Sequence, residues 1–389
     1  MSKYHLQGIV IRCLPCIFVT MFRQSISCFL FILFGSIGFH AHAQDPEYSQ
    51  LFSNRLHINP AFAGANKGLR MSLIHRQIWP NVPGPFNTSG FGLDINAPVL
   101  NGAIALTAMK DERGEGFIKT TKFGLTYAYR NLLGKRGNTE FSLATTINMV
   151  SKSIDWTRFE FSDQFDPYYG KIYQTSAAQP GNTVLFYPDF DFGFTMNHRL
   201  RLPNKEMYIG WGGATHHLFR PDESFLGIPH RLPRKVSGYL AAMIPLQHAL
   251  SKVPTFLFPH IYYGKQGKQS DLSTDVKFQN FMAGCMFYKE WYFIGLDYRN
   301  SPYTPAQNTD AFILTLGADG GFGEGGSYQI AYSFDFNLNG LSNRTWGSHE
   351  ISVVVALDNF RLANLRGGSG SRKKINCFDF PHRGVFRVF

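Results

Sequence analysis

Charge and cysteine are scarce in this 389-residue sequence. Charged residues make up 17% of the chain, and five residues are cysteines. After residue 43 there is no nucleophile elbow, phosphate-binding loop, H-E-x-x-H motif or C-x-x-C pair, so we expect no enzyme, catalytic residue or cofactor. The same region has no apolar run of 18 residues, so we expect no membrane-spanning helix.

The first 43 residues have the pattern of a secretory signal peptide. A positive residue precedes the apolar run 28–39, and the sequence A-H-A at 41–43 is a cleavage signature. The run of about 12 residues is too short to span a bilayer. We therefore predict Sec-type export with removal of residues 1–43. We also predict that translation starts at Met21, so that residues 1–20 are an annotation extension.

Alternation of large apolar residues with small or polar ones dominates the rest of the chain. It runs through 122–130, 141–149, 190–197 and 328–336. This period of two predicts β-strands with one apolar face. A soluble sandwich buries that face, whereas a membrane barrel turns it toward lipid, so alternation alone does not separate the two.

Strand length and number favour the membrane barrel. Most predicted strands have ten residues or more, as membrane strands need, and their number is even, as in bacterial single-chain barrels. We predict fourteen strands near 68–79, 87–97, 101–111, 119–132, 138–153, 187–199, 206–216, 233–247, 255–264, 274–289, 290–299, 308–318, 326–338 and 347–359.

The lengths of the connections support the same architecture. The longest segments, 154–186 and 217–232, are the fifth and seventh connections, whereas turns near 97–100 and 289–290 are short. Long exterior loops and short periplasmic turns are typical of outer-membrane barrels. We predict an all-β transmembrane antiparallel barrel over 67–360. Tryptophans lie mostly near predicted strand ends, as in aromatic girdles: Trp79, Trp156, Trp211, Trp291 and Trp346.

Acidic and aromatic residues gather in the connection 154–186. Asp163, Asp166, Tyr168 and Tyr169 suit the binding of a protein or glycan partner. The same residues could instead pack back into the barrel as a plug. The sequence leaves both interpretations open.

Two histidine-containing groups are candidate chemical sites. His216-His217 with Asp222 and Glu223 could hold a metal, but adjacent strand residues point to opposite faces, so we predict no metal site. Glu350, after His349 at a predicted strand start, is interpreted as part of a lumen or rim pair.

The end of the chain, 361–389, is basic and contains a Gly/Ser-rich stretch at 367–371. For an exported chain, nucleic-acid binding is implausible. We predict a basic periplasmic tail that contacts lipid headgroups or an acidic partner, with a merely solvated tail as the alternative.

Two groups of motifs lie at opposite ends of the region after residue 43. The first group is QDPEYSQLF at 44–52 with NPAFAG at 59–64, and the second is SFDF at 333–336, GLSN at 340–343 and GSHEIS at 347–352. Together they resemble the PorP/SprF family of Bacteroidetes outer-membrane proteins of the type IX secretion system. The residues that carry the resemblance are Asp45, Pro46, Ser49, Gln50, Asn59, Pro60, Ala61, Gly64, Gly340, Leu341, Ser342, Gly347, His349 and Glu350.

The resemblance implies a non-enzymatic barrel that works with the secretion and gliding machinery. It further implies a role in secretion or surface attachment of cargo, notably adhesins with a type B C-terminal domain. A short tail ending soon after Cys-Pro would be expected, whereas here Cys377 is followed by Phe378 and the chain continues.

The sequence leaves the placement of one segment and the function open. The segment 44–66, predicted to be periplasmic, could thread into the lumen or pack on the periplasmic rim; Asn59-Pro60 favours a turn and Gly64 a tight entry to the first strand. A passive porin or small-molecule transporter is the alternative function. It would need open charged rings, whereas the predicted inner face is rich in Gly, Ala, Ser and Thr.

Overall fold

The computed structural model describes residues 45–360 with gaps. The predicted signal peptide, the basic tail and the motif residues Gly340, Leu341 and Ser342 lie outside the described residues. The gaps are 67, 85, 115–117, 135–137, 203–204, 228, 247–254, 268–277, 305–306, 309, 324, 339–344 and 359.

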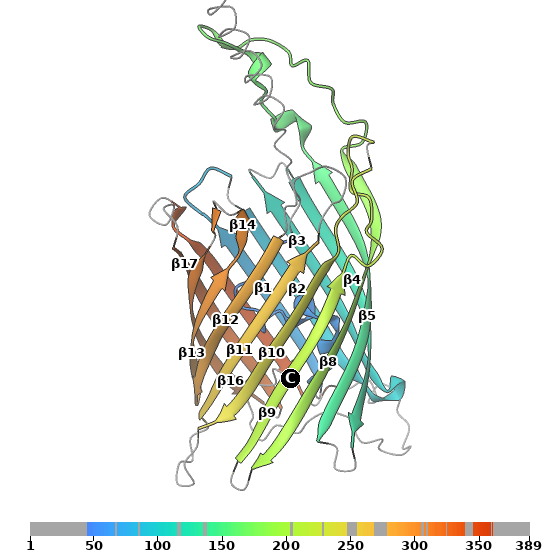
Figure 1. Cartoon of the computed structure of the whole chain (residues 1–389), viewed down its shortest axis with the longest axis vertical. Coiled ribbons are helices and arrows are strands. Elements are labelled where there is room, and N and C mark those ends of the chain that lie inside the picture. Colours follow the sequence, from blue (N-terminus) through green and yellow to red (C-terminus); the bar gives the residue numbers. More distant parts are fainter. Residues whose placement is uncertain are drawn as a thin grey trace, which may run out of the picture. The chain divides into compact units, whose positions relative to one another are not determined.

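The described residues form fourteen long strands in one closed antiparallel barrel (Figure 1). Each strand pairs with its neighbours along the chain, and β1 closes the barrel on β18. The strands are β1 Leu69–Ile78, β2 Phe86–Ala97, β3 Gly102–Arg113, β4 Ile118–Leu133, β5 Thr139–Ile154, β8 Val184–Leu202, β9 Lys205–His216, β10 Lys235–Pro245, β11 Thr255–Gln266, β12 Phe278–Lys289, β13 Tyr292–Asn300, β16 Ala311–Phe322, β17 Gly326–Asn337 and β18 Ser348–Leu357. The predicted fold class and strand number are confirmed.

Only short elements accompany these strands in the described part of the chain. None of the helices there is long and apolar enough to cross a membrane. The helices are α2 Arg55–Ile58, η1 Pro60–Phe62, η2 Pro98–Leu100, η3 Trp156–Arg158 and η4 Ser162–Gln164. The small strand pairs are β6 Phe165–Asp166 with β7 Gly170–Lys171, and β14 Pro302–Thr304 with β15 Gln307–Asn308.

The two faces of the wall differ as the alternation predicts. On β4, Phe123 and Leu125 are exposed on the outside, whereas Thr126 and Ala128 are buried inside. A water-soluble sheet would bury its apolar face, whereas an outer-membrane barrel turns that face outward to lipid. Because the apolar residues face outward here, the protein is a membrane barrel of the outer-membrane type.

The two ends of the barrel also differ. At one end, here called the long-loop end, lie the connections 79–85, 155–183 and 217–234; Figure 1 shows the second in green at the top. The opposite, short-turn end has tight turns such as 98–101 and 290–291. In outer-membrane barrels the long loops face the cell exterior.

Candidate functional site

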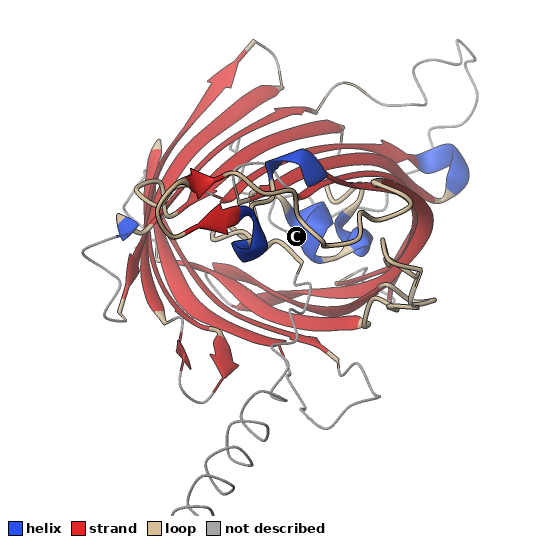
Figure 2. Cartoon of the chain, turned by 90° about the horizontal axis from the view of Figure 1, so that it is seen from above, coloured by secondary structure: helices blue, strands red, loops and turns tan. Residues whose placement is uncertain are grey.

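The described part of the N-terminal segment, residues 45–66, lies inside the barrel. Figure 2 shows several short helices within the ring of strands and others at its edge. Asp45 bonds to His217 and Gln266 at the long-loop end, whereas Gly64 reaches Asp94 near the short-turn end. Of the two placements that the sequence left open for the segment 44–66, residues 45–66 take the luminal one and form a plug, because the inner face offers them space and polar partners.

Ser49 and Gln50 bind the motifs from the other end of the chain. The backbone N–H groups of Ser49 and Gln50 donate to the two carboxylate oxygens of Glu350, at 2.8 and 2.6 Å. The Ser49 hydroxyl donates to Asp335 at 2.8 Å. The Gln50 amide donates to Ser333 Oγ (3.2 Å) and to the Glu350 carbonyl (3.1 Å). The two motif groups thus form one contact, although about 300 residues separate them.

Two arginines balance the acids of this contact. Arg76 pairs with Asp335 at 2.6 Å and with Glu350 at 2.9 Å, and all three side chains are at most 2% exposed. Arg299 adds a second pair with Asp335 at 2.8 Å. Since a buried charge is costly without a partner, these four groups depend on one another. We call this group (Arg76, Arg299, Asp335 and Glu350) the ionic cluster.

The two neighbours of the ionic cluster in the GSHEIS motif have structural roles. Gly347 has φ +62°, and a Cβ there would lie 2.2 Å from the Asp335 carbonyl oxygen, so glycine is required. His349 faces outward and contacts the Tyr332 hydroxyl at 2.7 Å. The lumen-or-rim interpretation therefore holds for Glu350, but His349 is not its partner, because adjacent strand residues face opposite ways.

A second polar contact holds the start of the segment. His217 lies 2.8 Å from both Asp45 and Asp189, and Lys235 pairs with Glu47 at 3.3 Å. Burial disfavours the protonated imidazole, but the carboxylates of Asp45 and Asp189 outweigh it and raise the pKa of His217 to about 10. Burial also opposes the Asp45 charge, yet His217 holds the pKa of Asp45 well below its usual range.

The metal-binding group considered from the sequence does not assemble. Glu223 pairs with Lys152 at 2.8 Å, while Asp222 accepts the N–H groups of Ser224 and His230 in its own loop. His217 instead lies with Asp189 and Asp191, a set close enough to hold a cation. Lys122 supplies positive charge there, at 3.4 and 3.1 Å from those two carboxylates.

The NPAFAG motif is the second half of the plug. Asn59 caps η1 by accepting the Ala61 N–H at 2.9 Å, and Pro60 occupies the first helical position. The Asn59 amide also donates to the Phe194 and Gly213 carbonyls of the wall, at 2.9 and 3.0 Å. The motif is thus fixed to β8 and β9.

Arg130 and Asp94 complete this contact. Arg130, which is ion-paired with Glu140, donates to the carbonyls of Ala61 (3.3 Å) and Ala63 (3.0 Å). The Gly64 N–H donates to Asp94 at 2.9 Å. Gly64 has φ +68°, and a Cβ there would lie 2.2 Å from that of Ala103, so both the turn and the packing need glycine.

An apolar cluster fills the other side of the lumen. Phe52 makes edge contacts with Phe258 (5.1 Å between ring centroids) and Phe62 (6.4 Å), and Phe62 packs on Tyr239 at 4.9 Å. The sequence suggested that the inner face carries small and polar residues throughout, and this is wrong for part of the wall. On β10 and β11 it carries large rings that bury the apolar residues of the plug.

We expect Gly193→Ala to destabilise the barrel by about 1–3 kcal/mol, because overpacking displaces fixed groups. The new Cβ would lie 2.1 Å from Asn59 Oδ1 and 3.0 Å from Pro60 Cδ. Urea unfolding of the lipid-embedded protein measures the change. Gly238→Ala is the matched control, since its Cβ would meet only the Gly212 carbonyl at 3.6 Å. Equal effects of the two variants would contradict this packing.

The tip of the connection 155–183 does not pack into the lumen as a plug. Tyr168 and Tyr169 at this tip are 92% and 80% exposed. The nearby acids bind their own loop. Asp166 accepts the N–H groups of both tyrosines, and Asp163 accepts the N–H and hydroxyl of Ser176. The four predicted residues thus form one tip, but the tyrosines are its free surface and the acids hold its shape.

We expect the tip to lose order in acid. The Ser176 N–H lowers the pKa of Asp163, and the N–H groups of Tyr168 and Tyr169 lower that of Asp166. Carboxylates with lowered pKa values stabilise the fold above the usual value of about 4, and this contribution disappears as the pH falls through the lowered values. NMR amide shifts of these residues should therefore stay constant from pH 7 to about 4 and change below. An unchanged spectrum at pH 2 would contradict these bonds.

Comparison with known proteins gives distant similarities among solved structures and one family match. No curated protein matches the sequence. Among solved structures, a Pseudomonas aeruginosa FadL homologue is 12% identical, with 82% of this chain and 100% of that chain covered and a TM-score of 0.40. The Ralstonia pickettii toluene transporter TbuX is 10% identical, with 78% and 91% covered and a TM-score of 0.40. At such low similarity nothing about their ligands is transferred.

The family comparison is more specific. Residues 40–355 match the family described as type IX secretion system membrane protein PorP/SprF. The matched range contains the plug, the ionic cluster and all of the barrel except the end of β18. The chain therefore belongs to the PorP/SprF family of type IX secretion system membrane proteins.

Proposed function

We propose that this type IX secretion component is a non-enzymatic partner or anchor for secreted cargo. In this role it supports secretion or surface attachment of proteins such as adhesins with a type B C-terminal domain. The observation that carries the proposal is the plug, which crosses the lumen and is held by buried ion pairs and hydrogen bonds. A plugged barrel suits a docking role better than the alternative, a passive porin or small-molecule transporter.

The tip of the connection 155–183 is the surface proposed to meet cargo. Tyr168 and Tyr169 stand almost fully exposed on a hairpin held by internal hydrogen bonds. Exposed tyrosines on a preorganised loop are favourable anchors, because they bury a large area at little entropic cost. They also lie at the end that faces the exterior in outer-membrane barrels.

The test is the amount of cargo on the cell surface. We expect the double variant Tyr168→Ala/Tyr169→Ala to reduce surface adhesin about tenfold or more, since anchor residues contribute at least about 2 kcal/mol each. Lys171→Ala is the control in the same hairpin, because the Lys171 side chain makes an exposed ion pair with Glu160, which contributes little. Unchanged surface adhesin after deletion of the whole gene would overturn the proposal.

A further inference from the structure

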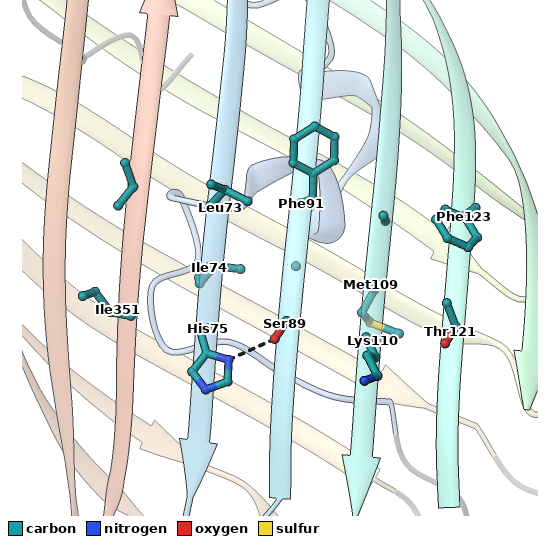
Figure 3. Close-up of a pocket in the computed structure, with 13 residues that line it drawn as sticks. Leu73, Ile74, His75, Ser89, Phe91, Met109, Lys110, Thr121, Phe123 and Ile351 are labelled. Atoms are coloured by element: carbon teal, nitrogen blue, oxygen red, sulfur yellow. Dashed lines mark hydrogen bonds between the residues drawn. The ribbon is translucent and has the colours of Figure 1, made fainter. Parts of the chain in front are cut away.

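A groove of about 520 Å³ lies in the outer wall of the barrel, on the side that faces lipid (Figure 3). It crosses β18, β1, β2, β3 and β4, and it is separate from the plug contacts described above. The residues that line it include Leu73, His75, Phe91, Ala108, Lys110 and Phe123.

The hollow comes from one small residue between two large ones. The strand register places Leu73, Phe91, Ala108 and Phe123 in one row across β1 to β4. Phe91 and Phe123 are the cross-strand neighbours of Ala108 on its two sides, and Phe123 is 60% exposed. Ala108 carries only a methyl group, so the row has a slot bordered by two rings.

The next row toward the long-loop end is polar. It consists of His75, Ser89, Lys110 and Thr121, which are paired across the same strands. His75 Nδ1 lies 2.9 Å from Ser89 Oγ (Figure 3). Outward polar residues are costly in hydrocarbon, so this row marks the level at which lipid chains give way to headgroups. The groove is therefore apolar on the side of this row toward the short-turn end, and it becomes polar toward the long-loop end.

Lys110 in the polar row, together with Glu112 and Lys119 in the next row toward the long-loop end, carries net positive charge. Lys110 Nζ lies 2.9 Å from Glu112 Oε1, and Lys119 Nζ lies 3.8 Å from the same oxygen. Two ammonium groups therefore share one carboxylate. Lys110 is 57% exposed, so its ammonium group can pair with a further anion at the headgroup level.

We propose that the groove binds a membrane lipid with an anionic phosphate headgroup. One acyl chain lies over Ala108 between Phe91 and Phe123, and the phosphate pairs with Lys110. An acyl chain fits the apolar slot, and a phosphate at the level of the polar row matches the charge. This inference does not depend on the proposed role with cargo.

The experiment measures retained lipid by native mass spectrometry. The full chain is placed in phosphatidylcholine nanodiscs that contain a minority of phosphatidylglycerol, and bound phosphatidylglycerol is counted after release. We expect Ala108→Phe, which fills the slot, to abolish retention, and Lys110→Gln to weaken it about fivefold. Heat-modifiable migration on a gel verifies that each variant is folded.

Matched controls lie on another side of the barrel. Ala283→Phe places the same ring on the outer face of β12, between Ile261 and Tyr298, and Lys289→Gln removes an exposed lysine. Both should retain phosphatidylglycerol as the unaltered protein does. Undiminished retention in Ala108→Phe, equal loss in Ala283→Phe, or displacement of the lipid by inorganic phosphate would overturn the proposal.

Discussion

Arg76→Ala is expected to lower the free energy of unfolding by about 3–5 kcal/mol and to loosen the plug. Arg76 is the only described side chain that pairs with both Asp335 and Glu350, and all three are buried. Without it, the two buried carboxylates would have Arg299 as a neighbour, which pairs with Asp335 and, in the described part of the chain, not with Glu350. Glu350 would then lose the counter-charge that lets it hold the Ser49 and Gln50 N–H groups.

Urea unfolding in lipid and limited proteolysis measure these two effects. Residues 45–52 should become cleavable in the variant while the strands stay protected. Arg201→Ala is the matched control, because Arg201 is 49% exposed and pairs with Glu206 at 3.5 Å. A surface pair of this kind contributes about 0–1 kcal/mol. Similar, small losses in both variants would contradict the ionic cluster.

Deleting residues 45–64 is expected to open the lumen of the barrel, so that the barrel becomes a pore. Eight strands enclose a space that side chains fill, and sixteen leave an aqueous channel, so a fourteen-stranded barrel needs added material to be closed. Here that material is the plug, and its large residues such as Phe52 and Phe62 would leave with it. Cells with the deletion should therefore become sensitive to large antibiotics that the outer membrane normally excludes.

A shorter deletion separates the two halves of the plug. Removal of 45–52 takes away the contacts with Glu350 and His217 but leaves Asn59 and Gly64 docked. We expect a smaller rise in sensitivity from this variant. If the longer deletion yields a folded barrel, verified by heat-modifiable migration, that still excludes the antibiotics, the plug is not the barrier.

The strands were predictable because their signal is local. Alternation along ten or more residues requires only that one face meets lipid and the other the lumen, and β17 ends within one residue of its prediction. Trp211 shows the limit of such patterns. It lies well inside β9, whereas Trp79 and Trp346 lie at strand ends. A single tryptophan is therefore a weak indicator of a strand end, because tryptophan also fits the lipid-facing side of a strand.

The plug was recognisable as a motif but not as a structure. Its contacts join Ser49 to Glu350 across about 300 residues, and no local periodicity reports such pairing. One signal was available: small inward residues, such as Gly193 and Ala128, left space that something had to fill. The charged residues Arg76 and Arg130, at inward strand positions, likewise needed partners that only the fold supplies.

The structural role of the loop acids was also not predictable, and their contact with a partner stays a prediction. Asp163 and Asp166 suggested partner binding by their chemistry, yet each accepts N–H groups within its own loop. Asp166 binds the backbone two and three residues on, as acidic residues in turns often do, whereas Asp163 binds Ser176, 13 residues along. The side chains of Tyr168 and Tyr169 are almost fully exposed, and these two residues remain the proposed contact surface.

Single-channel recording of the intact chain in a planar lipid bilayer tests the central claim most directly. If residues 45–66 close the lumen, the full-length protein shows no steady conductance of porin size, and the variant without 45–64 does. A large, steady current through the unaltered protein would contradict the account.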